Sequence, residues 1–328
     1  MNQTDAARLH AESIVIDGLN ASHFFDPRVL ERLHRGGVTA VNATIAAWHT
    51  PAETQEQIAA FAAVIAAHAD IVMPVRTVDD IAAAKASGRV GLITGFQDTA
   101  PLGDDLPQAL ATYHRLGVRV IQLTYNHPNR VGAGCMTPED GGLTPFGREV
   151  VREMNRLGIL VDVSHCGPRT TLDAIAASTR PIAITHANPR RFLDHPRNKT
   201  DAAIREVAAR GGVIGAVAFG ALLTRTMPAT LADYIAVIDD LVDLAGIEHV
   251  GLGPDFMEEM PAAVAARVLQ GTPPEVVQQF RSLPPTQGLE SVQAMPNVTA
   301  ALLARGYAPA DVQRIMGGNW LRLYGEVW

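Results

Sequence analysis

Three side chains suited to metal binding or acid–base chemistry occupy corresponding places in this sequence. His165, His186 and Asp255 each end a short apolar run of the kind that forms a buried strand. Two neutral imidazoles and a carboxylate can bind zinc or a similar divalent ion, which turns a bound water into a nucleophile near neutral pH. Asp255 would then be the general base for that water, or a ligand. The alternative is that both histidines bind substrate by hydrogen bonds, with no metal.

Further polar residues end or follow other apolar runs. Asp17, Gln97, Tyr125 and Asn126 end three of them, and we expect all four side chains to reach the same site. Arg197, in the segment DHPRN, can hold a substrate carboxylate through two parallel hydrogen bonds. The alternative for this arginine is an ordinary ion pair within the protein.

The elements that must position these residues alternate between strand and helix. Eight β-rich apolar runs are expected as strands: 14–17, 37–45, 90–97, 118–126, 160–165, 181–186, 212–219 and 249–255. Amphipathic stretches that are expected as helices lie between them: 54–69, 106–116, 146–157, 169–177, 201–210 and 231–244. Eight such units predict a (β/α)8 TIM-type barrel, with its site at the carboxyl ends of the strands. A doubly wound open sheet is the alternative.

We expect one domain over residues 1–328. After the eighth strand the chain contains the turn-rich pieces GTPP and LPPTQG, and helical patterning resumes at Leu289. Residues 258–328 are therefore predicted as a long loop, over about 258–287, followed by closing helices. A loop in this place could close over the pocket.

Composition narrows the class of protein. Of the 328 residues, 47% are hydrophobic and 19% are charged, as in folded globular proteins. The net charge of −7, without a cluster of Lys and Arg, argues against a nucleic-acid partner. We expect neither export nor a membrane anchor, because no signal peptide and no apolar run long enough to span a membrane is found. Two cysteines, Cys135 and Cys166, do not make a disulfide framework, which favours the cytoplasm.

Several long stretches resemble the membrane (renal) dipeptidase family of zinc peptidases, peptidase family M19, a group of amidohydrolase-like barrels. They are VIDG (15–18), GLTPFGREVVREMNRLGILVDVSH (142–165), THANPRRFLDHPRN (185–198), ARGGVIG (209–215), HVGLGPDF (249–256) and GGNWLRLYGEV (317–327). The resemblance implies that His165 and His186 bind the second zinc of a dinuclear pair. It also implies that Arg197 receives the substrate carboxylate and that Asp255 handles the proton.

Four positions depart from the family pattern. The His-x-Asp pair that binds the first zinc is replaced by Leu19 and Ala21, and the bridging glutamate by the neutral amide of Gln97. Tyr125 takes the place of a histidine that contacts substrate. The chain is therefore a divergent member, and we expect either one zinc ion, on two histidines with Gln97 as a further ligand, or none.

The leading hypothesis is a dipeptidase-like metallohydrolase acting on a small amide or dipeptide-like substrate with a free carboxylate. Asp255 is its catalytic residue, Arg197, Tyr125 and Asn126 bind substrate, and metal-bound water attacks. One alternative is acid–base chemistry of the isomerase or lyase type, with one metal or none. Another is a barrel that binds a small ligand without catalysis. The resemblance also implies a homodimer.

Overall fold

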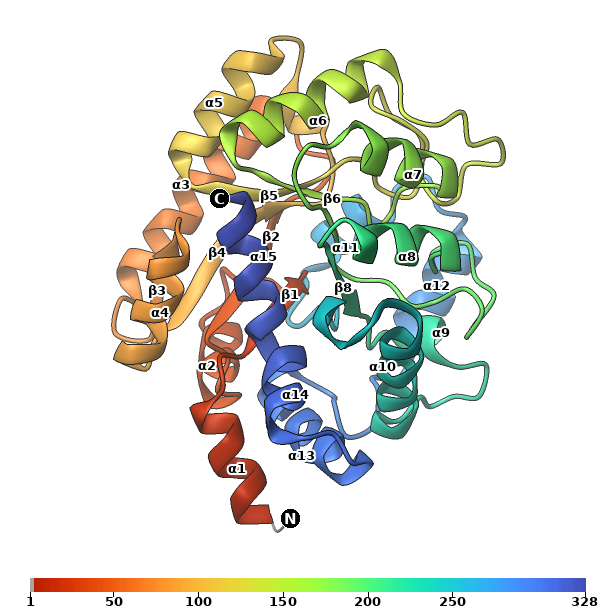
Figure 1. Ribbon diagram of the computed structural model, residues 1–328. Helices are drawn as coiled ribbons and strands as arrows, with labels where there is room; N and C mark the ends of the chain where they lie inside the picture. Colours follow the sequence, from red (N-terminus) through yellow and green to blue (C-terminus); the bar gives the residue numbers. More distant parts are fainter. Residues whose placement is uncertain (1–2) are drawn as a thin grey trace.

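Eight parallel strands close into a barrel in the computed structural model, which describes residues 3–328 (Figure 1). Around the ring the strands follow the order β2-β1-β9-β8-β7-β6-β5-β4, and β4 pairs with β2 to close it. The strands are β1 (Ile16–Asn20), β2 (Ala40–Ala46), β4 (Val90–Phe96), β5 (Val118–Gln122), β6 (Leu160–Asp162), β7 (Ala183–Ile184), β8 (Val213–Ala216) and β9 (Val250–Leu252). The predicted barrel is confirmed, and each predicted run overlaps one of these strands, although β1 and β2 extend past the ends of their runs.

A ninth strand, β3 (Val72–Val75), lies outside the ring. It pairs in parallel with β4, from Val72 opposite Val90 to Val75 opposite Ile93. The sequence prediction missed it, because four residues that include Pro74 make too short a strand signal. Since β2 pairs directly with β4, this strand adds to the sheet without entering the barrel.

Helices pack around the ring and begin where the sequence supplies a cap. Thr50, Thr77 and Thr230 form capping boxes, and Gly158 ends a helix in the left-handed conformation with φ of 73°. The helices are α1 (Gln3–Glu12), α2 (Pro27–Arg35), α3 (Pro51–Ala67), α4 (Val78–Ser87), α5 (Leu106–Leu116), α6 (Pro145–Leu157), α7 (Pro168–Ala177), α8 (Asp201–Ala209), α9 (Gly220–Leu223), α10 (Leu231–Ala245), α11 (Ala262–Val268), α12 (Pro274–Ser282), α13 (Met295–Arg305), α14 (Pro309–Gln313) and α15 (Asn319–Val327). No helix in residues 3–328 is long and apolar enough to cross a membrane.

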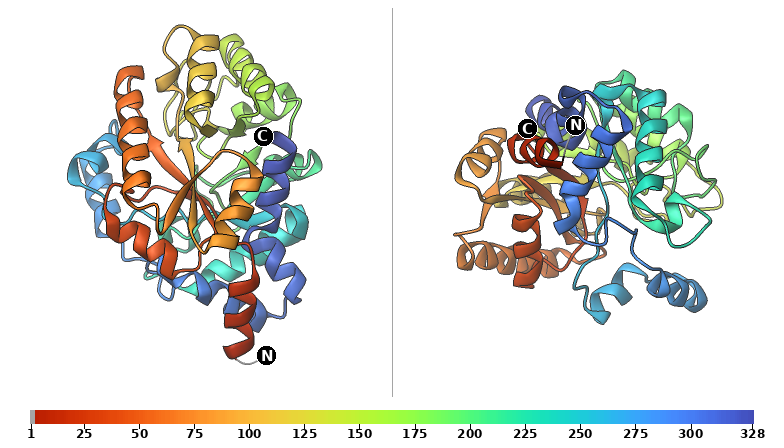
Figure 2. Two further views of the ribbon diagram at one scale, coloured as in Figure 1. Left: turned by 90° about the vertical axis from the view of Figure 1, so that its left-hand side faces the viewer. Right: turned by 90° about the horizontal axis from the view of Figure 1, so that it is seen from below.

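The stretch predicted as a long loop, residues 258–287, contains helices α11 and α12, and we call it the cap segment. The two views of Figure 2 show α11 and α12, in light blue, projecting from the rest of the molecule. The prediction of a loop here was wrong, because Gly271, Pro273 and Pro274 are strong turn signals although helices flank them.

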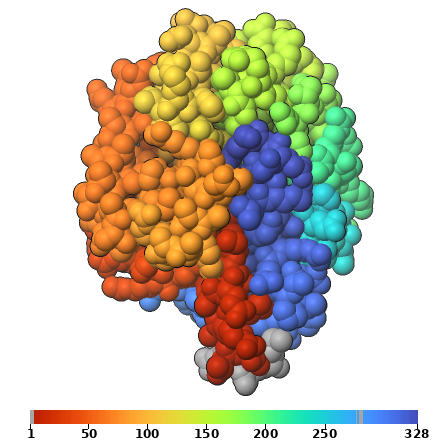
Figure 3. Space-filling view, turned by 60° about the vertical axis from the view of Figure 1, so that its left-hand side comes forward, coloured from red at the N-terminus to blue at the C-terminus, as the bar shows by residue number. Residues whose placement is uncertain are grey.

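Helix α15 closes the amino end of the barrel. Trp320 is fully buried among residues of the strands, and its indole Nε1 donates to the carbonyl of Leu252 at 2.9 Å. Gly18 and Gly251 permit this approach, since a Cβ at either position would lie 2.5 Å or 2.4 Å from the indole ring. Helix α1 packs against α13, and Figure 3 shows this first helix, in red, beside the blue helices of the C-terminal part of the chain. With this end closed, the carboxyl ends of the strands remain for a site.

Candidate functional site

A cavity of about 850 Å³ opens at the carboxyl ends of the strands, beneath the cap segment. The predicted site residues Gln97, Tyr125, Asn126, His165, Arg197 and Asp255 line it. His186 is fully buried and contacts His165. The expectation that Asp17 reaches this cavity was wrong. Its carboxylate is buried and accepts hydrogen bonds from the Leu19 backbone and the Asn20 amide.

His165 and His186 face one another through their Nε2 atoms, which lie 3.0 Å apart. On the far side of each ring a polar side chain holds Nδ1. The Nδ1 of His165 lies 2.7 Å from the Asn126 amide oxygen, and the Nδ1 of His186 lies 2.8 Å from the Thr185 hydroxyl. Each ring is therefore oriented by a hydrogen bond at its Nδ1 atom.

These partners determine which nitrogen of each ring carries the proton. An amide oxygen can only accept, so the Nδ1 of His165 is the donor. Thr185 donates its one hydroxyl proton to Asp162 at 2.7 Å, so it accepts from the Nδ1 of His186. In the neutral rings both Nε2 atoms then present lone pairs toward each other. Such a pair is arranged to share a cation, as metal-binding histidines are.

Two buried cations favour the neutral form of both rings. Burial, followed by the charge of Arg197, holds the pKa of His165 and of His186 well below the usual range. Lys199 adds to the effect, and its ammonium donates to the carbonyls of Val163 and Cys166 at 2.5 and 2.7 Å. The imidazoles are therefore unprotonated at neutral pH and able to bind a metal ion.

Arg197 lies beside the histidines and is almost fully buried. Its guanidinium donates to the carbonyl of Ser164 at 2.7 Å and to that of His186 at 2.6 Å. These bonds fix the side chain against the ends of β6 and β7. They use two of its five N–H groups, and Arg197 also lines the cavity, so donors remain for a ligand.

Asp255 follows β9 in the left-handed conformation, with φ of 63°. Its side chain keeps part of its surface open to the cavity, and no side chain that the structure describes forms a hydrogen bond with its carboxylate. Desolvation raises the pKa of Asp255 to about 6, although the charge of Arg197 opposes the shift. An unpaired carboxylate with this pKa is suited to accept and return a proton near neutral pH.

Tyr125 packs over the imidazole of His165, with ring centroids 4.1 Å apart and an interplanar angle of 17°. Its other neighbour is Trp48, which meets the phenol edge-on at 5.9 Å. Burial raises the pKa of Tyr125, so the phenol stays protonated. It can therefore donate a hydrogen bond to a ligand but cannot act as a base.

On the opposite side of the cavity mouth lie the residues at the positions where the sequence departs from the family pattern. Leu19 is buried, Ala21 lines the cavity, and the Gln97 amide donates to the Thr44 hydroxyl at 2.8 Å. Across residues 3–328, no group of three or more His, Cys, Asp or Glu side chains could hold a metal. A two-ion cluster does not fit these residues. A single ion fits the converging Nε2 atoms of His165 and His186.

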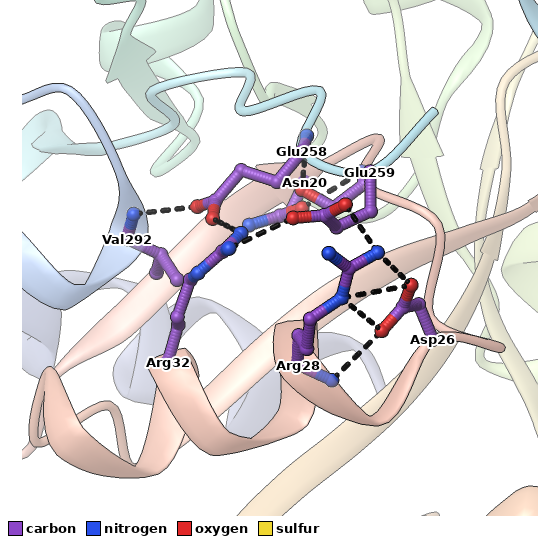
Figure 4. Close-up of polar contacts among 8 residues, drawn as sticks. Asn20, Asp26, Arg28, Arg32, Glu258, Glu259 and Val292 are labelled. Carbon is purple, nitrogen blue, oxygen red and sulfur yellow. Dashed lines mark hydrogen bonds and ion pairs between the residues drawn. The ribbon is translucent and has the colours of Figure 1, made fainter. Parts of the chain in front are cut away.

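Ion pairs tie the start of the cap segment to the barrel (Figure 4). Arg32 of α2 pairs with Glu258 and Glu259, each at 2.8 Å, and Arg28 pairs with Glu259 at 2.6 Å. The Glu258 carboxylate also accepts from the backbone of Val292 at 2.7 Å. These contacts hold the first residues of the cap segment in place against the barrel.

The middle and the end of the cap segment are also attached. Arg267 of α11 pairs with Glu53 of α3 at 2.9 Å. Thr286 donates to the carbonyl of Ala218 at 2.5 Å, and Gln287 donates to that of Ala229 at 2.8 Å. The cap segment thus forms one wall of the cavity.

Sequence reasoning missed the residues that support the histidines. Asp162 accepts from the hydroxyls of Ser164 and Thr185, and Lys199 crosses beneath β6. One signal was available, since a hydroxyl residue precedes each histidine, in Ser164-His165 and Thr185-His186.

Comparisons with known proteins place this geometry in context. The family model described as membrane dipeptidase (peptidase family M19) matches residues 2–266. The chain is 31% identical over 279 residues to dipeptidase tcpJ of Claviceps purpurea (strain 20.1), which covers 84% of this chain and 60% of that protein. It is 29% identical over 276 residues to dipeptidase verJ of Clonostachys rogersoniana, covering 84% and 65%. The chain therefore spans about 60 to 65% of the length of these two relatives.

Solved structures share the fold. The crystal structure of an amidohydrolase from Pseudomonas aeruginosa has a TM-score of 0.94 and 35% identity, covering 98% of this chain and 99% of that one. A metallo peptidase from Rhodobacter sphaeroides, liganded with a phosphinate mimic of the dipeptide L-Ala-D-Ala, has a TM-score of 0.79 and 23% identity, covering 97% and 100%.

Proposed function

The chain belongs to the membrane dipeptidase family (peptidase family M19), and from this premise we propose that it hydrolyses a small amide with a free carboxylate. One observation carries the proposal. The side of the mouth with His165, Arg197 and Asp255 brings an oriented imidazole, a carboxylate receptor and an unpaired base into one cavity. The names of the relatives support hydrolysis over isomerase, lyase or purely ligand-binding roles.

Arg197 binds the substrate carboxylate in this proposal. Its bonds to the carbonyls of Ser164 and His186 hold the guanidinium still, so little side-chain entropy is lost on binding. The phenol of Tyr125 donates to a polar group of the substrate. Asn126 keeps the His165 ring in place through its amide oxygen and also lines the cavity, where it can contact the substrate.

Asp255 moves the proton. Water adds to the amide carbon while the Asp255 carboxylate accepts one of its protons, and the same proton then passes to the leaving nitrogen as the C–N bond breaks. A single divalent ion, which we propose is zinc, would be held by His165 and His186 and would supply Lewis acidity at the amide carbonyl. The pKa of about 6 allows Asp255 to serve in both directions near neutral pH.

Hydrolysis is tested with the purified protein and a panel of dipeptides and N-acyl amino acids, by following the release of free amino acid. We expect release that depends on Asp255. An inert panel, with zinc added and with the parent protein correctly folded, would reject the proposal.

Two further proposals concern the protein in solution. A homodimer is supported by the family resemblance, and light scattering behind size-exclusion chromatography tests it. A cytoplasmic location is supported by two free, buried thiols, Cys135 and Cys166. Fractionation of the source cells tests the location.

A further inference from the structure

We propose that the substrate is an amino acid whose nitrogen carries a hydrocarbon acyl group, with the acyl chain lying under the cap segment. This inference rests on the proposed hydrolysis and specifies its substrate class. The amino-acid carboxylate meets Arg197, and the acyl carbonyl lies between Asp255 and the histidines. Hydrolysis then releases a carboxylic acid and a free amino acid.

The cavity is larger than a small dipeptide requires. Its volume of about 850 Å³ is near the upper end of the ~300–1,000 Å³ typical of sites for drug-sized ligands. Arg197 and Asp255 lie with His165 at the carboxyl ends of the strands. The remaining space needs a large substituent to fill it.

The wall of this remaining space is mostly apolar, with His49, Gln57 and Arg267 as polar members. Side chains from the rim of the barrel and from the cap segment make it up, notably Phe24, Phe25, Ile45, Met260, Val264 and Val268. Val264 is 37% exposed and lines the cavity, so a bound hydrocarbon chain would bury part of its surface. Methionines at 257 and 260 are flexible and polarisable, so they adapt to a hydrocarbon chain of variable shape.

Charge distinguishes an acylated nitrogen from the free amino group of a dipeptide. Among the described residues that line the cavity, Asp255 is the one carboxylate. Glu53 stands near the cap, but it is already paired with Arg267 at 2.9 Å. On the side of the mouth where the family carries acidic metal ligands, this chain has Ala21 and Gln97. On that side of the mouth an ammonium group would find no carboxylate among the described lining residues, whereas a neutral acyl chain needs none.

The test is a series of N-acyl-L-alanines with acetyl, butanoyl, hexanoyl and decanoyl groups, compared with L-Ala-L-Ala. We expect kcat/KM to rise by up to about fourfold per methylene, which is the gain from full burial of each CH₂. Hexanoyl should exceed acetyl by at least about tenfold, even if only part of that gain is realised. Equal or falling values along the series, with the acetyl compound and the dipeptide cleaved, would overturn the inference and leave the proposed hydrolysis standing.

Two variants of helix α11 test where the acyl chain of the substrate lies. Val264→Asp places a charge in the apolar wall, and the ratio of decanoyl to acetyl kcat/KM should fall by about tenfold. Ala263→Asp adds the same charge at an exposed neighbour outside the cavity lining, and the ratio should keep its parent value. Equal effects of the two variants would contradict the proposed position of the acyl chain.

Binding separates this inference from the hydrolysis on which it rests. If no compound is cleaved, calorimetric titration of the same N-acyl-alanines measures their affinity directly. Affinity that increases with chain length would support the inference although the proposed hydrolysis has failed. Affinity that is independent of chain length would overturn the inference as well.

Discussion

The two sides of the cavity mouth are built from the same strand–helix units but differ in chemistry. On the side of β6, β7 and β9, the polar groups of His165 and His186 have defined partners. On the side of β1 and β4, Leu19 is buried as a core residue and the Gln97 amide makes one bond to Thr44. At the positions compared, the first side carries ionisable groups and the second carries an apolar side chain and a neutral amide.

This difference indicates where the chain depends on its polar network. A buried imidazole or ammonium destabilises the protein unless hydrogen bonds compensate for lost hydration, and Asp162, Thr185 and Lys199 provide such bonds. A buried leucine requires only packing. The barrel can therefore lack one set of metal ligands and still fold. Removal of a hydrogen-bond partner of His165 or His186, on the β6–β7 side, should by contrast lower activity directly.

The largest effect is expected from Asp255→Asn. Loss of a general base should lower kcat/KM by about 10³-fold. The variant should be at least as stable as the parent at pH 7, since Asn tolerates a φ of 63° and the carboxylate is disfavoured in its desolvated position. Steady-state kinetics and thermal melting measure the two quantities. Retention of a tenth or more of the activity would show that the base lies elsewhere, even on the apolar side.

The metal content of the purified protein tests whether only one side of the cavity mouth can hold an ion. Elemental analysis of protein prepared without chelators should find at most about one equivalent of zinc, and none in a variant that combines His165→Ala and His186→Ala. Two equivalents in the parent would mean that the side with Leu19 and Ala21 holds an ion after all. The double variant serves as the blank.

A matched pair of threonine variants compares the two sides directly. Thr185→Val removes the acceptor that orients His186, and metal affinity or activity should fall by about 10 to 100-fold. Thr44→Val removes the one hydrogen bond of the Gln97 side chain, and we expect a change of less than about threefold. Zinc competition with a chromogenic chelator, together with kcat/KM, provides the measurement. Equal losses would remove the distinction between the sides.

The dependence of activity and stability on pH is a further test of the side that carries Asp255. The raised pKa of Asp255 means that the base is protonated below about pH 6, so kcat/KM should fall about tenfold per pH unit on the acid side. Stability should change in the opposite sense. The folded state keeps a proton that the unfolded chain has released, so stability declines as pH rises from about 4 to 6. An acid limb that persists unchanged in Asp255→Asn would assign it to another group.

Sequence predicted the barrel because strands buried on both faces appear as continuous apolar runs, such as VGLITGF of β4. The sequence did not predict helices α11 and α12, because both are short and the glycines and prolines of the cap segment are stronger signals for turns. Strand ends were also predicted well enough to name the residues of the cavity.

The supporting network could not be predicted in the same way. Whether Asp17 faces the cavity depends on the alternation of side chains along β1, and a displacement of one residue reverses it. The contact of Asn126 with His165 depends on how two loops approach each other, and no local pattern encodes that approach. The structure therefore adds the contacts between side chains that lie far apart in the sequence.

Strand β3 has a consequence for the behaviour of the protein at high concentration. A strand at the end of a sheet exposes unpaired backbone groups, on which another chain can build an intermolecular sheet. With four residues, β3 offers few such groups, and Pro74 has no N–H to donate. The strand is thus a poor template for aggregation, although it lies outside the closed ring.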